Sequence, residues 1–446
     1  MKSTLRPAAS LLPLALALAA LAAPAQAQSL VDLYEAARGH DAAWQIARAQ
    51  YDANIWRAEQ ARAGLLPQVG LQASIARSQF EGTTGPVAAE RPFGTRGYVL
   101  SASQPLYRPA NFATYEQSRR QAEFAKAQLD AAGQDLVVRV SQAYFDVLAA
   151  QDTLAFVRAA KAAVSEQLAS ARRNFEVGTA TITDTREAQA RFDLSTAQEI
   201  AAENDLRVRK LALDTVVGRA NATPLPLAAP VTLALPQPVD AEAWVTQGEA
   251  ASPIIQQARL NTDVARLETK KARAGHLPTL DLTASRSDSR NPNGSVTTAL
   301  ASRTEVNQIG LTLTVPLFSG FATQNRIRET LSLEERAEAE LDSARRTVAQ
   351  NTRTAYFGVV SGQSQVRALE AAEASTQSAL DANRLGYQVG VRVNIDVLNA
   401  QSQLFQTKRD LAVARYNVLL GQLRLRQANG SLTPEDLNQL NAMLAR

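Results

Sequence analysis

Two stretches of the sequence carry side chains suited to specific polar contacts. "FEVGTATITDTRE" occupies residues 175–187, and "YQVGVRVNIDVLN" occupies residues 387–399. Each has an aromatic residue, a Val-Gly pair and an aspartate six residues after the glycine, and they lie 212 residues apart. Their hydroxyl, guanidinium and carboxylate groups can form hydrogen bonds and ion pairs. The alternative is that they are ordinary helix caps and solvated charges at a turn.

Residues able to perform catalysis or hold a metal are scarce. The chain has two histidines, His40 and His276, which are 236 residues apart, and it has no cysteine. No zinc or thiol site and no phosphate-binding glycine loop can be assembled from this set. Chemistry that uses carboxylates alone stays open, although no carboxylate pair stands in an apolar setting. We therefore predict a protein that is not an enzyme and has no cofactor or metal, with both histidines at a surface or an interface.

The first 27 residues have the features of a secretory signal peptide. Lys2 and Arg6 precede the apolar run "LLPLALALAALA", and Ala25-Gln26-Ala27 supplies small residues for cleavage before Gln28. A single membrane-anchor helix is the alternative. Because the signal carries two basic and no acidic residues, its removal leaves a formal charge of +2, which does not favour nucleic acid as a partner.

Most of the remaining chain is an internal duplication. "ARAGLLP" returns as "ARAGHLP", "QPLY" as "VPLF" and "AYF" as "AYF", each at an offset of 211 or 212 residues. Proline-rich sequence separates the two copies. We divide the chain into a signal peptide, a first repeat, a linker, a second repeat and a C-terminal tail: 1–27, 28–220, 221–240, 241–430 and 431–446.

Long helices are predicted in each repeat. No proline occurs from 110 to 223 or from 317 to 433. Within these stretches residues recur every seven positions, which is typical of coiled-coil packing. The rows are Val147, Leu154, Lys161, Leu168, Phe175 and Val397, Leu404, Leu411, Val418, Leu425. A helix over 110–175 would be ~100 Å long at ~1.5 Å per residue.

Four shorter segments alternate apolar and polar residues and are predicted to be strands. They are "QVGLQASIA", "GYVLSAS", "TLDLTAS" and "NQIGLTLTVPL". Their length of ~10 residues suits a tilted membrane-crossing strand. Loops rich in turn-forming residues are expected between the members of each pair, over 80–94 and 288–305. Four strands of a soluble sheet with one wet face are the alternative.

Four strands cannot close a barrel, and open edges in lipid leave backbone groups without partners. Two chains would give eight strands, whose interior is normally filled by side chains, whereas three chains would give twelve and a lumen. The predicted fold class is mainly α with a small β part. Long coiled-coil helical hairpins are expected, and four strands per chain would contribute to a trimeric twelve-stranded transmembrane β-barrel.

These motifs resemble the TolC family of outer-membrane efflux proteins: "LLP" and "HLP" before a strand, "PLY" and "PLF" after one, "AYF" on the long helix, and "VG" followed by Asp at the turn. The resemblance covers essentially 28–429. It implies a homotrimer in the outer membrane of a Gram-negative bacterium, in which the long coiled-coil helical hairpins form an α-barrel that extends into the periplasm. It also implies a passive exit duct that works with a periplasmic membrane-fusion adaptor and an inner-membrane RND or ABC transporter, in multidrug efflux or type I secretion. Outer-membrane lipid would surround the barrel.

The resemblance also implies roles for residues at the two turns. In the family, a tyrosine and an arginine on the second hairpin hold the periplasmic entrance shut by contacting a Thr-Asp pair on the first. These positions match Tyr387, Arg392, Thr183 and Asp184. Asp396 would line the aperture, and Asn399 stands where members often have a second aspartate.

A periplasmic coiled-coil scaffold or pump adaptor without a membrane barrel is the alternative function. It would share the signal peptide and the long helices. The four alternating segments favour the channel, because a scaffold has no need of strands that cannot close into a barrel.

Overall fold

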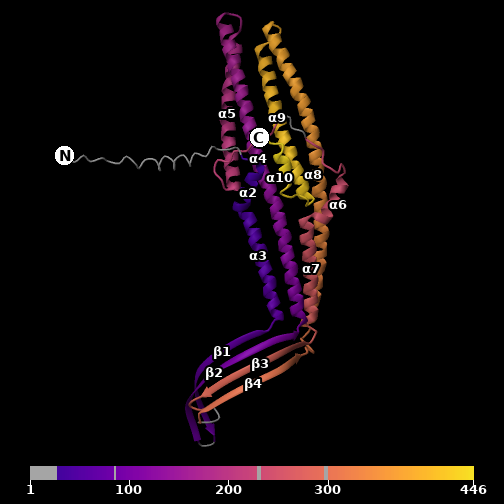
Figure 1. The fold of residues 1–446 in the computed structure, drawn as a ribbon. Coiled ribbons are helices and arrows are strands. Elements are labelled where there is room, and N and C mark those ends of the chain that lie inside the picture. The colour runs from indigo at the N-terminus through magenta and orange to yellow at the C-terminus, as the bar shows by residue number, and fades with distance from the viewer. Residues whose placement is uncertain (1–27, 85–86, 229–232, 296–299, 446) are drawn as a thin grey trace, which may run out of the picture. The chain divides into compact units, whose positions relative to one another are not determined.

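The chain is mainly helical, with four strands that form one sheet (Figure 1). The computed structural model describes residues 28–84, 87–228, 233–295 and 300–445. The expected signal peptide, 1–27, lies outside the described residues.

The helices and strands follow the same order in both halves of the chain. The first half contains α2 (Leu30–His40), α3 (Ala42–Arg62), the 3-10 turn η1 (Ala63–Leu65), β1 (Gln68–Thr84), β2 (Val87–Tyr107), α4 (Pro109–Glu176) and α5 (Ile182–Val217). The second half contains α6 (Ala241–Ala251), α7 (Pro253–Ala274), β3 (Thr279–Asn291), β4 (Ser302–Thr314), α8 (Ala322–Gln388), α9 (Asn394–Ala428) and a short final helix, α10 (Asp436–Asn441). Each half therefore begins with two helices, continues with two strands and a very long helix, and has one further helix after a turn.

Helix α4 agrees closely with its predicted extent. It has 68 residues and begins at Pro109, where the missing N–H of proline costs nothing because the first-turn N–H groups have no partner within the helix. Helix α8 has 67 residues and begins six residues after Pro316. Both helices lie in the proline-free stretches.

Two compact units share the chain. Unit 1 consists of the described parts of Met1–Ile46, Asp130–Ser252 and Thr347–Arg446, and unit 2 consists of Ala47–Leu129 and Pro253–Arg346. Unit 1 holds the two helical turns that the sequence analysis singled out. Unit 2 holds the sheet and the parts of the helices that adjoin it.

The core of unit 1 confirms the seven-residue spacing. All five members of the second row are buried, as are Val147, Leu154 and Leu168 of the first. Lys161 instead forms an ion pair with Glu199 at 2.8 Å. Phe175 was expected in the apolar row, yet it is 44% exposed because α4 ends one residue later.

The C-terminal segment also belongs to the core of unit 1. Four of its leucines are buried in the same cluster as Leu33 of α2 and Val217 of α5: Leu432, Leu437, Leu440 and Leu444. The backbone N–H of Ala445 donates to the carbonyl of Pro226 at 2.8 Å. The last residues therefore contribute to packing.

In unit 2 the four strands pair in chain order, all antiparallel, as Figure 1 shows. The strands exist where they were predicted, but their lengths differ. The pairing of β1 with β2 continues to Thr84 and Val87, and that of β3 with β4 to Asn291 and Ser302. The expected loop over 80–94 is therefore strand at its described residues, and 288–305 is strand only at its two ends, with 292–295 and 300–301 outside the strands as expected. A backbone ladder can continue past the apolar rows through residues that disfavour strands. At its other end β4 stops at Thr314, so the predicted continuation to Leu317 is wrong.

Cross-strand register sorts the side chains of the sheet onto two faces. One face carries the row Val69–Ala102–Ala284–Ile309 and, on β4, Leu311 and Leu313. The opposite face carries small polar rows such as Gly70–Ser101–Ser285–Gln308. The predicted alternation is confirmed, and we call these the apolar face and the polar face.

Polar contacts tie the sheet to the helices of unit 2. The Arg108 guanidinium, just after β2, donates to both carboxylate oxygens of Asp281 at 2.8 and 2.7 Å. Asn111 donates to the carbonyl of Gly64 at 2.6 Å. Within the described residues, no helix combines the length and the apolar character that crossing a membrane requires.

Candidate functional site

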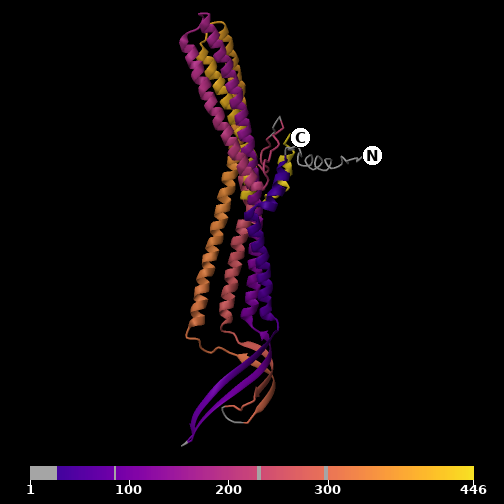
Figure 2. The ribbon, with the colours of Figure 1, turned by 90° about the vertical axis from the view of Figure 1, so that its left-hand side faces the viewer.

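The two singled-out turns lie at the same end of unit 1, where α4 passes into α5 and α8 passes into α9 (Figures 1 and 2). Each pair of helices forms a hairpin. We call α4–α5 the first hairpin and α8–α9 the second hairpin. The site consists of the turns and the surfaces through which the hairpins contact each other.

The local backbone geometry of the first turn accounts for part of its sequence. Gly178 has φ of +78°, a left-handed conformation that glycine adopts without steric cost. Thr181 caps α5: its hydroxyl accepts from the N–H of Asp184 at 3.2 Å, and the Asp184 carboxylate accepts from the N–H of Thr181 at 2.9 Å. Asp184 therefore acts here as a helix-capping residue.

The second turn uses the same backbone with different side chains. Gly390 has φ of +77°, and Val393 precedes α9 without a side-chain cap. The Arg392 side chain lies over Gly386, where an added Cβ would come within 2.7 Å of its Cγ. Its guanidinium is 3.7 Å from the carboxylate of Asp396, in the first turn of α9.

The structure brings together a different set of partners from the predicted latch. Among the described residues, no hydrogen bond or ion pair joins Tyr387 or Arg392 to Thr183 or Asp184. The hydroxyl of Tyr387 instead accepts from the Asn174 amide at 3.4 Å, and Thr183 is exposed.

Nearest the turns, three polar contacts join the two hairpins; Tyr416–Asp152 and Arg424–Gln142 also join them farther along α9 and α4. Besides Asn174–Tyr387, Gln167 of α4 donates to the side-chain carbonyl of Asn394. Arg191 of α5 donates to the side-chain carbonyl of Asn399 at 2.7 Å. Asn399, one of the two predicted aperture residues, thus links α9 to the first hairpin.

An apolar contact accompanies them. Leu398 is fully buried and belongs to a cluster with Val164, Leu168 and Ala171 of α4 and Ala188 of α5. Burying a leucine side chain is worth about 1.5–3 kcal/mol. Leu398 is therefore the apolar anchor of the second hairpin on the first nearest the turns, whereas farther along α9 Tyr416, Leu419, Leu420 and Leu423 share a larger core with α4. The heptad row in the sequence does not indicate it, because Leu398 lies one position outside the row that begins at Val397.

Polar side chains are also buried beside this anchor. Asn394 and Gln401 are 1% and 2% exposed, and the amide nitrogen of each has no hydrogen-bond partner within the described residues. Leaving such a donor unpaired costs about 1–3 kcal/mol. The two are seven residues apart, so a polar row at heptad spacing was the signal that could have revealed them.

The two histidines lie in different units, His40 in unit 1 and His276 in unit 2. His40 and His276 are both exposed, as predicted for surface residues. Tyr416 donates to the Asp152 carboxylate at 2.6 Å between α9 and α4, and burial raises the pKa of both groups. Within the described part of the chain no cluster of three or more acidic or histidine side chains is arranged for a metal.

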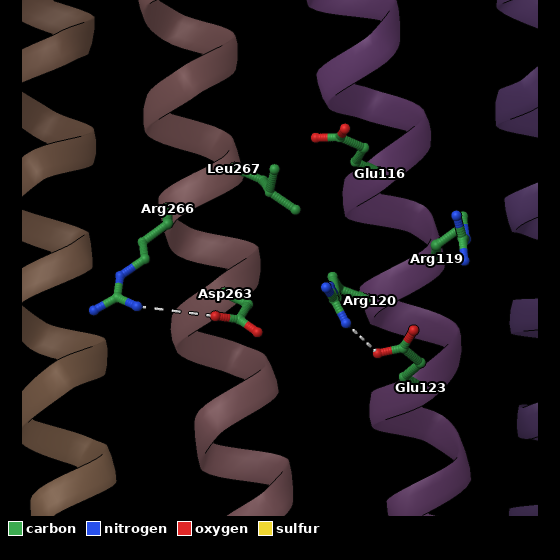
Figure 3. Close-up of a pocket in the computed structure, with 7 residues that line it drawn as sticks. All are labelled: Glu116, Arg119, Arg120, Glu123, Asp263, Arg266 and Leu267. Atoms are coloured by element: carbon green, nitrogen blue, oxygen red, sulfur yellow. Dashed lines mark hydrogen bonds and ion pairs between the residues drawn. The ribbon is translucent and has the colours of Figure 1, made fainter.

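A pocket of about 420 Å³ between α4 and α7 in unit 2 is lined by charges that are largely paired (Figure 3). Arg120 lies 2.7 Å from Glu123, and Arg266 lies 3.9 Å from Asp263. On the same helix α7, burial disfavours the charged form of Glu268, but hydrogen bonds from Lys271, Arg326 and Gln117 outweigh it and lower its pKa to about 2. Ionised carboxylates that are held in ion pairs are poorly suited to exchange protons with a substrate.

Known proteins resemble this chain along almost its full length. The chain is 34% identical to the outer membrane protein TolC of Vibrio cholerae over 436 residues, which is 97% of this chain and 98% of that protein. It is 33% identical to the alkaline protease secretion protein AprF of Pseudomonas aeruginosa, covering 93% of this chain and 87% of that protein.

Solved structures share the fold. The transmembrane channel CusC matches with a TM-score of 0.79 at 18% identity, covering 91% of this chain and 93% of that one.

The family model described as "Outer membrane efflux protein" matches residues 33–219 and 244–431, one segment in each half of the chain. The chain therefore belongs to the outer membrane efflux protein family.

Proposed function

We propose that three copies of this chain form an outer-membrane channel-tunnel that is the passive exit duct of a tripartite efflux or type I secretion system. The observation that carries the proposal is a four-stranded sheet with an apolar face, a polar face and an open edge at β1 and at β4. Unpaired edge groups are costly in hydrocarbon, so further copies must complete the sheet. Twelve strands leave a lumen, whereas eight are normally filled by side chains.

The two faces of the sheet support a barrel with the apolar face toward lipid and the polar face toward the lumen. Leu71, Ile309 and Leu311 on the apolar face are 65–79% exposed in the single chain. Their contact with lipid would remove that apolar surface from water. The polar face, with its serines, threonines and glycines, would line the lumen.

The names of the relatives support the proposed partners. One relative is a protease secretion protein, and the family description refers to efflux. We propose that the trimer docks on a periplasmic membrane-fusion adaptor and, through it, on an inner-membrane RND or ABC transporter. Energy and cargo selection would reside in that pump, and no catalytic role is proposed for this chain.

We further propose that the chain arose by duplication, with repeats at 28–220 and 241–430 joined by the linker 221–240 and followed by the tail 431–446. The matching order of elements supports this division. Three chains would then contribute six hairpins to the tunnel, with the two turns of each chain at its periplasmic end.

The gate is proposed at these turns. Arg392 is 59% exposed and Thr183 is exposed, so both are available to another copy of the chain. Tyr387 and Arg392 of one copy would latch onto Thr183 and Asp184 of the next, while Asp396 and Asn399 face the aperture. A neutral hydrogen bond is worth about 0.5–1.5 kcal/mol and one to a charged group about 1.5–3 kcal/mol.

The double variant Tyr387→Phe/Arg392→Ser is expected to increase ion conductance in a planar lipid bilayer, because each chain loses one neutral and one charged contact at the entrance. Arg384→Ser is the matched control, since Arg384 is an exposed arginine of the same helix before the turn. Wild-type conductance in the double variant, or an equal rise in the control, would contradict the latch.

The proposed assembly is tested by mild crosslinking of cell envelopes, purification of this chain and identification of the inner-membrane protein that accompanies it. Native mass spectrometry of the purified protein in detergent should give a trimer. Recovery of a soluble periplasmic monomer would favour the scaffold or adaptor function instead.

A further inference from the structure

The apolar face of the sheet contains a trough of about 390 Å³ whose lining comes from all four strands. Its floor is formed by Ala102 of β2 and Ala284 of β3, which are direct register partners. Val69 pairs with Ala102 on one side, and Ile309 pairs with Ala284 on the other. Two small side chains between two large ones leave a depression one side chain deep, and its lining is predominantly apolar.

One end of the trough is charged. Arg286 lines it, lies on the same face two residues after Ala284, and is 59% exposed. Its guanidinium is 3.8 Å from the Glu305 carboxylate, a distance at which an exposed ion pair is weak. The guanidinium is therefore available to a second anion.

More arginines follow Arg286 on the same face, toward the β3–β4 turn. Arg290 and Arg303 share the buried carboxylate of Asp288, at 3.3 and 2.6 Å. Arg96 is the register partner of Arg290 and has no ion pair within the described residues.

Arg77 of β1 is exposed on this face as well. This part of the apolar face thus has five arginines and two acids. The arginines are Arg77, Arg96, Arg286, Arg290 and Arg303, and the acids are Asp288 and Glu305. Two further acids, Glu81 and Glu90, oppose each other nearer the β1–β2 turn and hydrogen-bond to Gln79. The rows next to the trough are therefore basic.

The position of this charge relative to a bilayer follows from the strand connections. The helices of unit 2 adjoin the start of β1 and β3 and the end of β2 and β4, whereas the arginines lie toward the strand-to-strand turns. In the proposed function, on which this placement rests, the sheet crosses the outer membrane and the helices lie in the periplasm. The turns then point outward, and the arginines lie at the level of the outer-leaflet headgroups.

We propose that the trough binds an acyl chain of a phosphorylated glycolipid of the outer leaflet, with Arg286 donating hydrogen bonds to its phosphate. Arginine matches phosphate geometry with two parallel N–H groups. The surplus of arginines favours a headgroup with more than one phosphate over a single zwitterionic phosphodiester. Because the floor lies on β2 and β3, the two central strands, pairing of β1 and β4 with other copies leaves the site open to lipid.

The test is native mass spectrometry of the full-length protein in detergent, titrated with bisphosphorylated lipid A or with phosphatidylethanolamine. The wild type should retain lipid A in preference to phosphatidylethanolamine. Ala284→Leu combined with Arg286→Gln, which fills the trough and removes its charge, should weaken lipid A binding about tenfold or more. The oligomeric state in the same spectra reports whether the variant assembles like the wild type.

Two control variants separate the trough from the rest of the surface. Ala73→Leu adds the same side chain on the same face but outside the trough lining, and Arg266→Gln removes an arginine of α7. Both should bind lipid A like the wild type. Equal binding by the trough variant and the controls would overturn the site, and equal retention of the two lipids by the wild type would overturn the headgroup assignment. Neither result depends on conduction, so the channel function can fail or stand independently.

Discussion

Replacing Leu311 by arginine should reduce the yield of assembled, membrane-inserted protein by tenfold or more. Leu311 lies in the middle of the apolar row of β4, opposite Leu282, and is 65% exposed in the single chain. An arginine that faces lipid near the middle of a bilayer costs ~2–4 kcal/mol per chain, and the proposed trimer would incur that cost in each of its chains. The yield is measured as oligomer in purified outer membranes.

Thr312→Arg is the matched control, because it introduces the same residue one position along the strand on the opposite face. Thr312 is the register partner of Asp281, so the new guanidinium would lie near a carboxylate on the polar face. We expect nearly wild-type yield. If both variants assembled equally, or if Thr312→Arg were the more damaging, the assignment of the lipid-facing and lumen-facing sides would be reversed or wrong.

Leu398→Ala should loosen the contact between the two hairpins and increase conductance. Truncation of a fully buried leucine typically costs about 2–5 kcal/mol, and this one anchors the second hairpin on α4 and α5. The amides of the first turns of α5 should exchange hydrogen faster, because local opening requires less free energy. Hydrogen exchange reports the packing, and planar-bilayer recordings report the gate.

Leu404→Ala provides the comparison. Leu404 is 3% exposed, but its cluster consists of Leu380 and Val397, which belong to the same hairpin. This variant should lose comparable stability without faster exchange in α5 and without higher conductance. Similar behaviour of the two leucine variants would show that the contact between the hairpins does not control the entrance.

Much of the architecture could be predicted from the sequence, because it depends on the periodicity of apolar residues. The seven-residue row from Val397 to Leu425 predicted a buried helix face, and the alternation around Ile309 predicted the two faces of β4. The absence of proline after Pro109 predicted a single helix of the observed length. Each of these signals is local and needs no knowledge of the partner surface.

The candidate site was harder to predict from the sequence, because it depends on which helix surfaces contact each other. A heptad row indicates that Val397 is buried but not against which hairpin, so the role of Leu398 between hairpins was missed. The strand lengths were underestimated because glycine and proline in 80–94 suggested a loop, whereas the hydrogen-bond ladder overrides weak strand propensity. The latch between Tyr387, Arg392 and Asp184 stays a prediction, since within one chain Asp184 caps its own helix.

The unpartnered amides of Asn394 and Gln401 have a mechanical consequence for the hairpins. Leu398 resists their separation, because separation would expose it to water. The two amides within one turn of it promote separation, because water would complete their hydrogen bonds. The free energy needed to separate the hairpins at this contact is therefore the difference between these two effects, which is smaller than the burial of Leu398 alone would give.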